Sequence, residues 1–173
     1  MSHYVNNKEF YQAMIQYKNE LAVTKKKKLP PPRISEYVGT CIFNIATRFA
    51  TKHNFSRYSY KEEMISDGIE NCIKYIHNFN PEKSNNPFSY FSQIISNAFI
   101  ARIAKEEKQQ YIKMKSMETY SHEEEFAGKN TPEFEKVRKD IIDSFELKKK
   151  NKLKKKPKKT KEGLSTFMDK SDE

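Results

Sequence analysis

Tryptophan is absent from this chain of 173 residues, and glycine and cysteine are scarce, with four and two residues. Four scattered glycines cannot build a glycine-rich phosphate loop, and the sequence contains no Gly-x-Ser-x-Gly turn. Neither cysteine has a second one at the spacing of a metal or redox motif, and the four histidines are dispersed. We therefore expect no catalysis, no metal site and no cofactor.

Long apolar stretches are also missing. No hydrophobic run approaches the roughly 20 residues that a bilayer crossing needs, and no signal-peptide pattern opens the chain. The hydrophobic share is low, at 36%, and the apolar residues are concentrated in the first 120 positions. We therefore expect a soluble, intracellular protein with its core in that part of the chain and no contact with a membrane.

The positive charge is concentrated toward the C-terminal end. The net charge is +10, but residues 148–161 hold ten lysines and no acidic residue. Without that run, 23 basic side chains stand against 23 acidic ones. Contact with nucleic acid should therefore come from a local face of the folded part. We expect the lysine run to be disordered, because like charges repel and little apolar surface can be buried.

Apolar residues recur every three to four positions in five segments, and no segment has the alternation of a strand, which predicts an all-α fold. The expected helices cover residues 7–23, 35–53, 59–79, 88–117 and 131–147. The resulting organisation is a compact helical bundle over 1–120, a short helix with a flexible lysine-rich tether over 121–161, and a terminal peptide over 162–173.

Local signals support these boundaries. Ser35 is suited to cap the second helix, and Ser59 with Glu62 three residues later has the form of a capping box for the third. Cys41 and Cys72 fall on apolar faces of predicted helices. A reduced thiol there behaves as a small hydrophobic group, so we expect both cysteines in the core.

The predicted third helix has an apolar and a polar face. The residues expected to point inward are Ile65, Ile69, Cys72, Ile73 and Ile76. The acidic and polar stripe on the other side consists of Glu63, Ser66, Asp67, Glu70 and Asn71. Such a stripe suits a protein partner rich in arginine, although most stripes of this kind are solvated helix faces.

An aromatic turn, Phe88-Ser-Tyr-Phe91, leads into the fourth predicted helix. The polar side of that helix carries Gln93, Asn97, Arg102, Lys105 and Lys108. Rings stack on bases, amides bind base edges and cations bind phosphates, so this combination suits an unpaired DNA strand. The phenylalanines also fit a core stripe, which is their commoner role. Tyr90, Gln93 and Ile94 lie off that stripe and are the better candidates for contact.

Two segments carry a resemblance to a known family. Residues 63–79, EMISDGIENCIKYIHNF, and residues 88–95, FSYFSQII, resemble the central domain of bacterial sigma factors. The shared pattern is an acid, two apolar residues, a polar residue, acid-Gly and an apolar repeat, followed after a short loop by Phe-Ser and an aromatic residue. Within that superfamily the sequence is most similar to the late-transcription sigma factors of T-even-type bacteriophages.

The resemblance implies a transcription initiation factor that binds the core of bacterial RNA polymerase and opens promoter DNA. It places Glu63, Ser66, Asp67 and Ile73 at the coiled coil of the polymerase's largest subunit, and the acidic stripe adds Glu70. It places Asn86, Phe91, Gln93, Ile94 and Arg102 at flipped bases of an A/T-rich promoter element, to which the residue pattern adds Tyr90, Asn97 and Lys105. Ile94 and Ile95 replace the tryptophan pair of ordinary sigma factors. Isoleucine stacks poorly, so weak melting is expected.

We expect no helix-turn-helix module of the kind found in ordinary sigma factors after residue 120, because one short helix and the lysine run are too little for it. In the resembling phage proteins, the DNA-polymerase sliding clamp supplies the missing anchor and grips a short apolar and acidic motif. Leu164, Phe167 and Met168 are expected to form such a motif. The expected partners are therefore the polymerase core, promoter DNA, the phage sliding clamp and a late coactivator. The expected location is the cytoplasm of the infected host bacterium, at its nucleoid.

Two other functions stay open on the residues alone. The lysine run would serve a sequence-independent nucleic-acid-binding protein. The acidic stripe would serve an inhibitor that binds polymerase without touching promoters. Mapping of transcription start sites with purified polymerase separates the three, because only an initiation factor creates new and specific starts.

Overall fold

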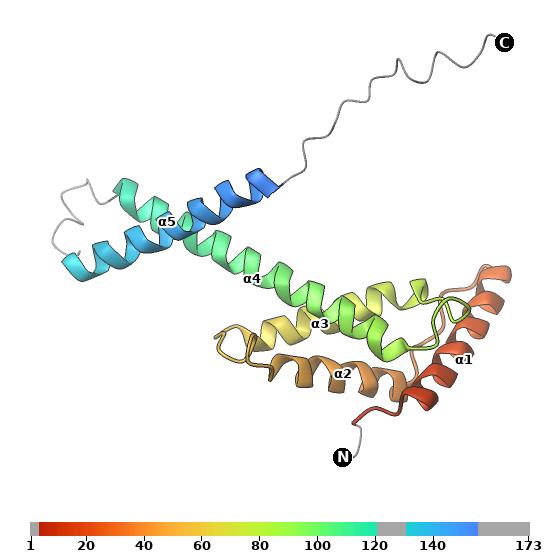
Figure 1. The fold of residues 1–173 in the computed structure, drawn as a ribbon. Helices are drawn as coiled ribbons and strands as arrows, with labels where there is room; N and C mark the ends of the chain where they lie inside the picture. Colours follow the sequence, from red (N-terminus) through yellow and green to blue (C-terminus); the bar gives the residue numbers. More distant parts are fainter. Residues whose placement is uncertain (1–3, 121–130, 156–173) are drawn as a thin grey trace, which may run out of the picture. The chain divides into compact units, whose positions relative to one another are not determined.

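The chain folds into α-helices. The computed structural model describes residues 4–120 and 131–155, and within these ranges it contains helices and no strand, which confirms the predicted all-α class. The helices are α1 (Asn7–Lys26), α2 (Glu36–Ala50), α3 (Lys61–Tyr75), α4 (Pro87–Tyr120) and α5 (Pro132–Lys155), with a 3₁₀ turn at Ile76–Asn78 (Figure 1). The chain divides into two compact units, of which the first ends at Glu106.

In the first unit, α1 lies across the ends of the other helices (Figure 1). The Tyr11 hydroxyl donates to the carbonyl of Pro81 at 3.1 Å, and the Lys18 ammonium donates to the carbonyl of His77 at 2.9 Å. Both acceptors belong to the segment between α3 and α4. Because these bonds join positions far apart in sequence, α1 belongs to the same core as the later helices.

The core of this unit is dominated by aromatic and branched side chains. Phe10 of α1 stacks on Phe91 of α4 with ring centroids 5.4 Å apart, and Phe99 meets the edge of Phe49 at 5.7 Å. Such pairs add to the stabilisation from buried apolar area. The largest side chains removed from solvent are Phe10, Phe79, Phe91, Phe99, Met14, Ile42, Ile45, Met64 and Ile95.

The buried stripe of α3 differs from the predicted one. It consists of Met64, Gly68 and Cys72, which repeat every fourth residue and face the core. Of the isoleucines expected inward, Ile65 and Ile69 are half-buried, Ile76 is buried and Ile73 is 51% exposed. The inward assignment of Ile73 is therefore corrected.

A glycine allows α3 to approach α4 closely, which explains the shifted stripe. A Cβ atom built on Gly68 would lie 3.1 Å from Cε1 of Phe99 and 3.5 Å from a methyl group of Ile95. A larger residue at position 68 would push the two helices apart. Gly68 therefore faces α4, and Ile65 and Ile69 lie at the sides of the buried stripe, where they are half-buried.

The helix starts agree with the sequence in two cases and differ in one. The Ser35 side chain accepts from the amide of Val38 at 3.4 Å, and the Thr131 hydroxyl accepts from the amide of Phe134 at 3.3 Å, as predicted for α2 and α5. The expected capping box at Ser59 does not form: the cap residue is Tyr60, one position later, and it makes no side-chain bond to the first turn of α3.

The cysteines are buried, as predicted. Cys41 is 4% exposed and Cys72 is fully enclosed, and neither forms a disulfide. Burial raises the pKa of the Cys72 thiol to about 12, because the thiolate would have to leave water. Both side chains therefore act as core packing groups.

The second unit pairs the C-terminal part of α4 with α5. Tyr111 stacks on Phe145 with centroids 4.5 Å apart, and the Lys148 ammonium lies 2.7 Å from a carboxylate oxygen of Glu107. Ile142 is buried between them. This pairing joins residues that the sequence analysis assigned to the bundle and to the tether.

Helix α5 is longer than predicted. It continues to Lys155, so residues 148–155 of the lysine run are helical and not disordered as expected. Lysine is a good helix former, and cations near a helix C-terminus interact favourably with its dipole, which offsets the mutual repulsion. The rest of the run, residues 156–161, lies outside the described residues.

Candidate functional site

An acidic face covers the outer side of α3. Glu63, Ser66 and Glu70 are all exposed and follow one another at steps of three and four residues, which places them on one side of the helix. These positions lie where the sequence analysis put them. The face is available to a basic partner.

Asp67 is not part of that free face. Its carboxylate accepts two hydrogen bonds from Arg102 of α4, at 2.6 Å from Nε and 2.7 Å from Nη2. A third bond joins Nη1 of Arg102 to Glu106 at 3.2 Å. From the sequence, Asp67 was predicted to contact polymerase and Arg102 to contact DNA. In the structure each side chain is instead the other's partner, and the hydrogen bond to Asp67 raises the pKa of Arg102.

An apolar groove, the α2–α3 groove, runs beside the acidic face. It has a volume of about 430 Å³, and its lining residues are Ile34, Ser35, Glu36, Gly39, Thr40, Ile42, Phe43, Ile69 and Ile73. Phe43 and Ile73 are 53% and 51% exposed, so the groove presents two large apolar side chains to solvent. An apolar groove bordered by carboxylates suits a helix or coiled coil that carries apolar anchors and arginines.

A second groove, the α3–α4 groove, has a different chemistry. It has a volume of about 340 Å³, and its lining residues are Asn71, Tyr75, Asn78, Tyr90, Ile94, Asn97, Ala98 and Ala101. Three side-chain amides and two tyrosine rings surround a small apolar floor. Amides read base edges and rings stack on bases, so the groove has the groups that hold an unpaired base.

Hydrogen bonds fix part of this second groove. The Tyr90 hydroxyl donates to the carbonyl of Tyr75 at 2.9 Å, and the Asn71 amide donates to the carbonyl of Asp67 at 2.8 Å. Gln93 donates to the side chain of Asn97 at 3.0 Å. Burial raises the pKa of Tyr90, so its hydroxyl stays protonated and remains a donor.

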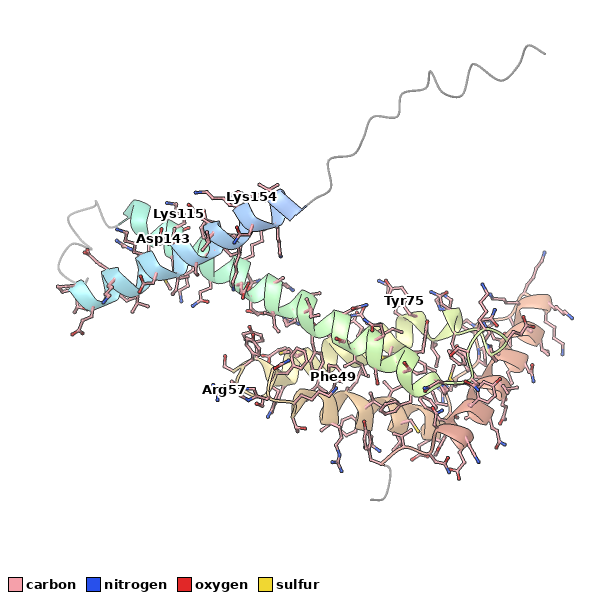
Figure 2. All side chains as sticks on the ribbon, in the orientation of Figure 1. Phe49, Arg57, Tyr75, Lys115, Asp143 and Lys154 are labelled. Atoms are coloured by element: carbon pink, nitrogen blue, oxygen red, sulfur yellow. The ribbon has the colours of Figure 1, made fainter. Side chains whose placement is uncertain are left out.

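The two grooves lie on opposite sides of α3. Ile69 and Ile73 line the first groove, whereas Asn71 and Tyr75 line the second. A two-residue offset in an α-helix corresponds to about 200° of rotation. Tyr75, which is labelled in Figure 2, is the last residue of α3. A single short helix therefore supplies a wall to each of two chemically distinct recesses.

The residues predicted to contact DNA are only partly gathered. Tyr90, Ile94 and Asn97 line the α3–α4 groove, and Gln93 is exposed and bonded to Asn97. Lys105 is exposed further along α4.

Two other predicted DNA contacts have structural roles. Asn86 caps α4 by accepting from the amide of Ser89 at 3.0 Å. It also lines a separate pocket of about 660 Å³ with Tyr4 and Phe88. Phe91 is fully buried and stacked on Phe10, so its assignment as a base contact is corrected.

The isoleucine pair has split roles. Ile94 is half-buried in the α3–α4 groove, whereas Ile95 is completely enclosed in the core. Successive residues on a helix point about 100° apart, so both cannot face the same recess. Only Ile94 is placed to touch a ligand in the groove.

Sequence reasoning missed Tyr75 and Asn78 and gave Asn71 to the acidic stripe. Asn71 and Tyr75 are four residues apart and so share a helix face, a signal that could have grouped them. Asn78 follows Tyr75 by three residues, so the same spacing extends the face to the 3₁₀ turn at the end of α3.

Three predicted site residues, Leu164, Phe167 and Met168, lie outside the described residues. Among the residues that are described, no three His, Cys, Asp or Glu side chains gather as a metal site. No helix in those ranges has both the length and the apolar character that a membrane crossing requires. In comparisons with known proteins, no family model and no curated protein matches this chain.

Proposed function

We propose that this chain is a sigma-like transcription initiation factor, which binds the core of a bacterial RNA polymerase and engages an A/T-rich promoter element. The observation that carries the proposal is the pair of grooves on opposite sides of α3. An initiation factor must hold a protein and a DNA strand at the same time. Two recesses of different chemistry, back to back on one helix, are suited to that task.

The polymerase would dock on the α2–α3 groove and the acidic face of Glu63, Ser66 and Glu70. The exposed rings and methyl groups of Phe43 and Ile73 supply the apolar contact that dominates most interfaces. The carboxylates beside them select a basic partner and speed the encounter. The partner of this chemistry is the coiled coil of the polymerase's largest subunit.

The promoter strand would place one flipped base in the α3–α4 groove. Extraction of a base from the duplex costs a few kcal/mol, and stacking with amide hydrogen bonds can offset that. A/T-rich steps are the easiest to open. With a single isoleucine, Ile94, at the groove and no tryptophan, the factor would depend on the polymerase and on other proteins for efficient opening.

A sliding clamp, through residues 162–173, and a late coactivator would complete the assembly. The proposed location follows from these partners: the cytoplasm of an infected bacterium, at its nucleoid. The factor itself would catalyse nothing.

The first experiment maps transcription starts with purified core polymerase on an A/T-rich promoter. New starts at defined positions support the proposal. General retardation of all DNA without new starts would indicate a sequence-independent binding protein, and lowered transcription without new starts would indicate an inhibitor. Either of these outcomes rejects the initiation function.

Single substitutions then test the role of each groove separately. Ile73→Arg should weaken co-purification with core polymerase by about 10-fold or more, whereas Val23→Arg, at a similarly exposed site on α1, should not. Tyr75→Ala should keep polymerase binding and lower permanganate reactivity of promoter thymines. If Ile73→Arg binds like wild type, or if Tyr75→Ala opens DNA normally, the corresponding groove assignment is rejected.

A further inference from the structure

A basic segment covers most of α2, the loop that follows it and the first residue of α3. From residue 37 to residue 61 the chain contains no acidic side chain, and its cations are Arg48, Lys52, Arg57 and Lys61. Without its lysine run the chain has equal numbers of basic and acidic side chains, so a stretch of this length without an acid is a local concentration of positive charge. None of these four cations lines either of the two grooves described above.

The loop of residues 51–60 is held in a defined shape. Phe55 meets the edge of Phe99 with ring centroids 5.3 Å apart and lies 5.4 Å from Phe49. The amides of Phe55 and Ser56 both donate to the carbonyl of Lys52, at 2.8 and 2.9 Å. An anchored loop presents its charges without a large ordering cost on binding.

The cations of this segment are available to an anion. Arg48, Lys52 and Arg57 are exposed, Lys61 is half-buried, and Figure 2 shows Arg57 at the loop. None of these four makes an ion pair with a carboxylate in the described part of the chain. Lys52 lies 3.8 Å from the ring centroid of Phe49, which steadies its stem and leaves its charge unneutralised. Cations that have no carboxylate partner within the chain are free to bind an anion of another molecule.

Tyrosine rings stand among these charges. Tyr58 and Tyr60 have ring centroids 5.2 Å apart and are half-buried, between Arg57 and Lys61 in sequence. An acidic peptide would use the cations but has no need of the rings. A single nucleic-acid strand uses both, since its phosphates bind cations and its bases stack on aromatic faces.

We propose that the α2–α3 loop binds single-stranded nucleic acid without regard to sequence: Lys52, Arg57 and Lys61 contact phosphates, and Tyr58 stacks on a base. This site is separate from the α3–α4 groove and does not depend on the proposed initiation function. It would hold a strand by its backbone, whereas the groove would hold one base.

The test uses the full chain and a fluorescein-labelled oligothymidine strand, with binding followed by anisotropy over a salt series. The Lys52→Gln/Arg57→Gln/Lys61→Gln variant should lower the slope of log affinity against log salt by about two, because each lost phosphate contact on a single strand contributes about 0.7. The tail lysines are present in every variant, so their contribution cancels in the comparison.

A matched control removes the same charge elsewhere. Lys8→Gln/Lys26→Gln/Lys83→Gln changes three exposed lysines of the same unit and should leave the slope nearly unaltered. The loop variant Lys52→Arg/Arg57→Lys/Lys61→Arg keeps the charges and should bind like wild type, and an unchanged circular dichroism spectrum of the Gln variant excludes an effect of misfolding. Equal slope losses in the loop and control variants would overturn the proposal.

A second variant tests the base contact. Tyr58→Leu should weaken binding of the single strand by about 5-fold or more and leave binding of a duplex of equal length unchanged. If strand and duplex respond alike, the single-strand assignment is overturned. If the loop variant keeps its oligonucleotide affinity and loses core polymerase, the loop is a protein contact. Failure of the initiation function would instead appear as unchanged oligonucleotide binding without any polymerase binding.

Discussion

Asp67 and Arg102 join α3 to α4 through two parallel hydrogen bonds, although 35 positions separate them in sequence. Their side chains keep 28% and 17% of their exposure, so the pair is partly shielded from water. A two-pronged pair of this geometry fixes the relative position of the helices on either side of the α3–α4 groove. The groove therefore depends on a contact that is not itself part of its lining.

Asp67→Asn should lower the free energy of unfolding by about 1 to 3 kcal/mol, since it leaves the guanidinium with a weaker partner at a half-shielded site. Urea unfolding measures the loss. Glu63→Gln, on the exposed face of the same helix, is the control and should stay within about 0.5 kcal/mol of wild type. Equal stability of Asp67→Asn and wild type would contradict a structural role for the pair.

The two helical glycines should respond in opposite directions to added side chains. Gly39→Ala should stabilise the chain by about 0.5 to 1 kcal/mol, because nothing lies within 4 Å of the new Cβ and alanine favours the helix. Gly68→Val should destabilise it by about 1 to 3 kcal/mol, because the added atoms meet the Phe99 ring. Thermal unfolding of both variants checks the pair, and a stabilising Gly68→Val would refute the close approach of α3 to α4.

Alkaline pH should weaken the fold through Cys72. Its folded pKa of about 12 exceeds the value of an unfolded thiol, about 8.5. The folded state therefore keeps a proton that the unfolded state loses, and the contribution is complete below pH 8.5 and declines as the pH rises toward 12.

Wild type should lose about 1.4 kcal/mol more per pH unit than Cys72→Ala between pH 9 and pH 11. Urea unfolding of both proteins at several pH values measures this difference. Ionisation of the tyrosines other than Tyr90 is common to both proteins and cancels, whereas burial, together with the charge of the Cys72 thiolate, raises the pKa of Tyr90. A difference in stability that is independent of pH would show that the thiol is accessible to water.

Deletion of residues 162–173 should leave basal transcription from an A/T-rich promoter nearly unchanged and remove its enhancement by a DNA-loaded sliding clamp. A tethered anchor can strengthen overall binding by about 100-fold to 10,000-fold without new DNA contacts. Phe167→Ala alone should remove most of that gain, and Thr166→Ala is the neighbouring control. Run-off transcription with and without loaded clamp is the measurement, and full enhancement of the truncated chain would reject the assignment.

The positions of the helices could be predicted from the sequence, because the apolar periodicity of a helix involves only residues that are close together in the chain. Ser35 caps α2 as expected, and Thr131 caps α5 at the predicted start of that helix, since a cap depends only on residues within one turn. The inward face of α3 could not be obtained in the same way. Hydrophobicity predicts the isoleucines on the inward face, whereas the buried face is centred on Gly68. This glycine faces the core because its small size lets α3 approach α4.

The candidate site was predictable only in part. Tyr90, Ile94 and Asn97 were identified from one aromatic helix, but their groove also needs Tyr75 and Asn78 from the end of α3. The pairing of Asp67 with Arg102 could not be predicted from the sequence either, because no periodic pattern connects a carboxylate to a guanidinium on another helix. Residue chemistry suggested an exposed role for each, and tertiary packing brought them together.

The back-to-back grooves on α3 give the two proposed partners one shared structural element. If binding on one side shifts α3, the wall that α3 presents on the other side changes with it. By reciprocity, if occupancy of the α2–α3 groove changes affinity in the α3–α4 groove by some factor, occupancy of the second changes the first by the same factor. Promoter DNA would then change the affinity of the factor for polymerase. Release of the factor from polymerase would depend on whether the melted strand still occupies the α3–α4 groove.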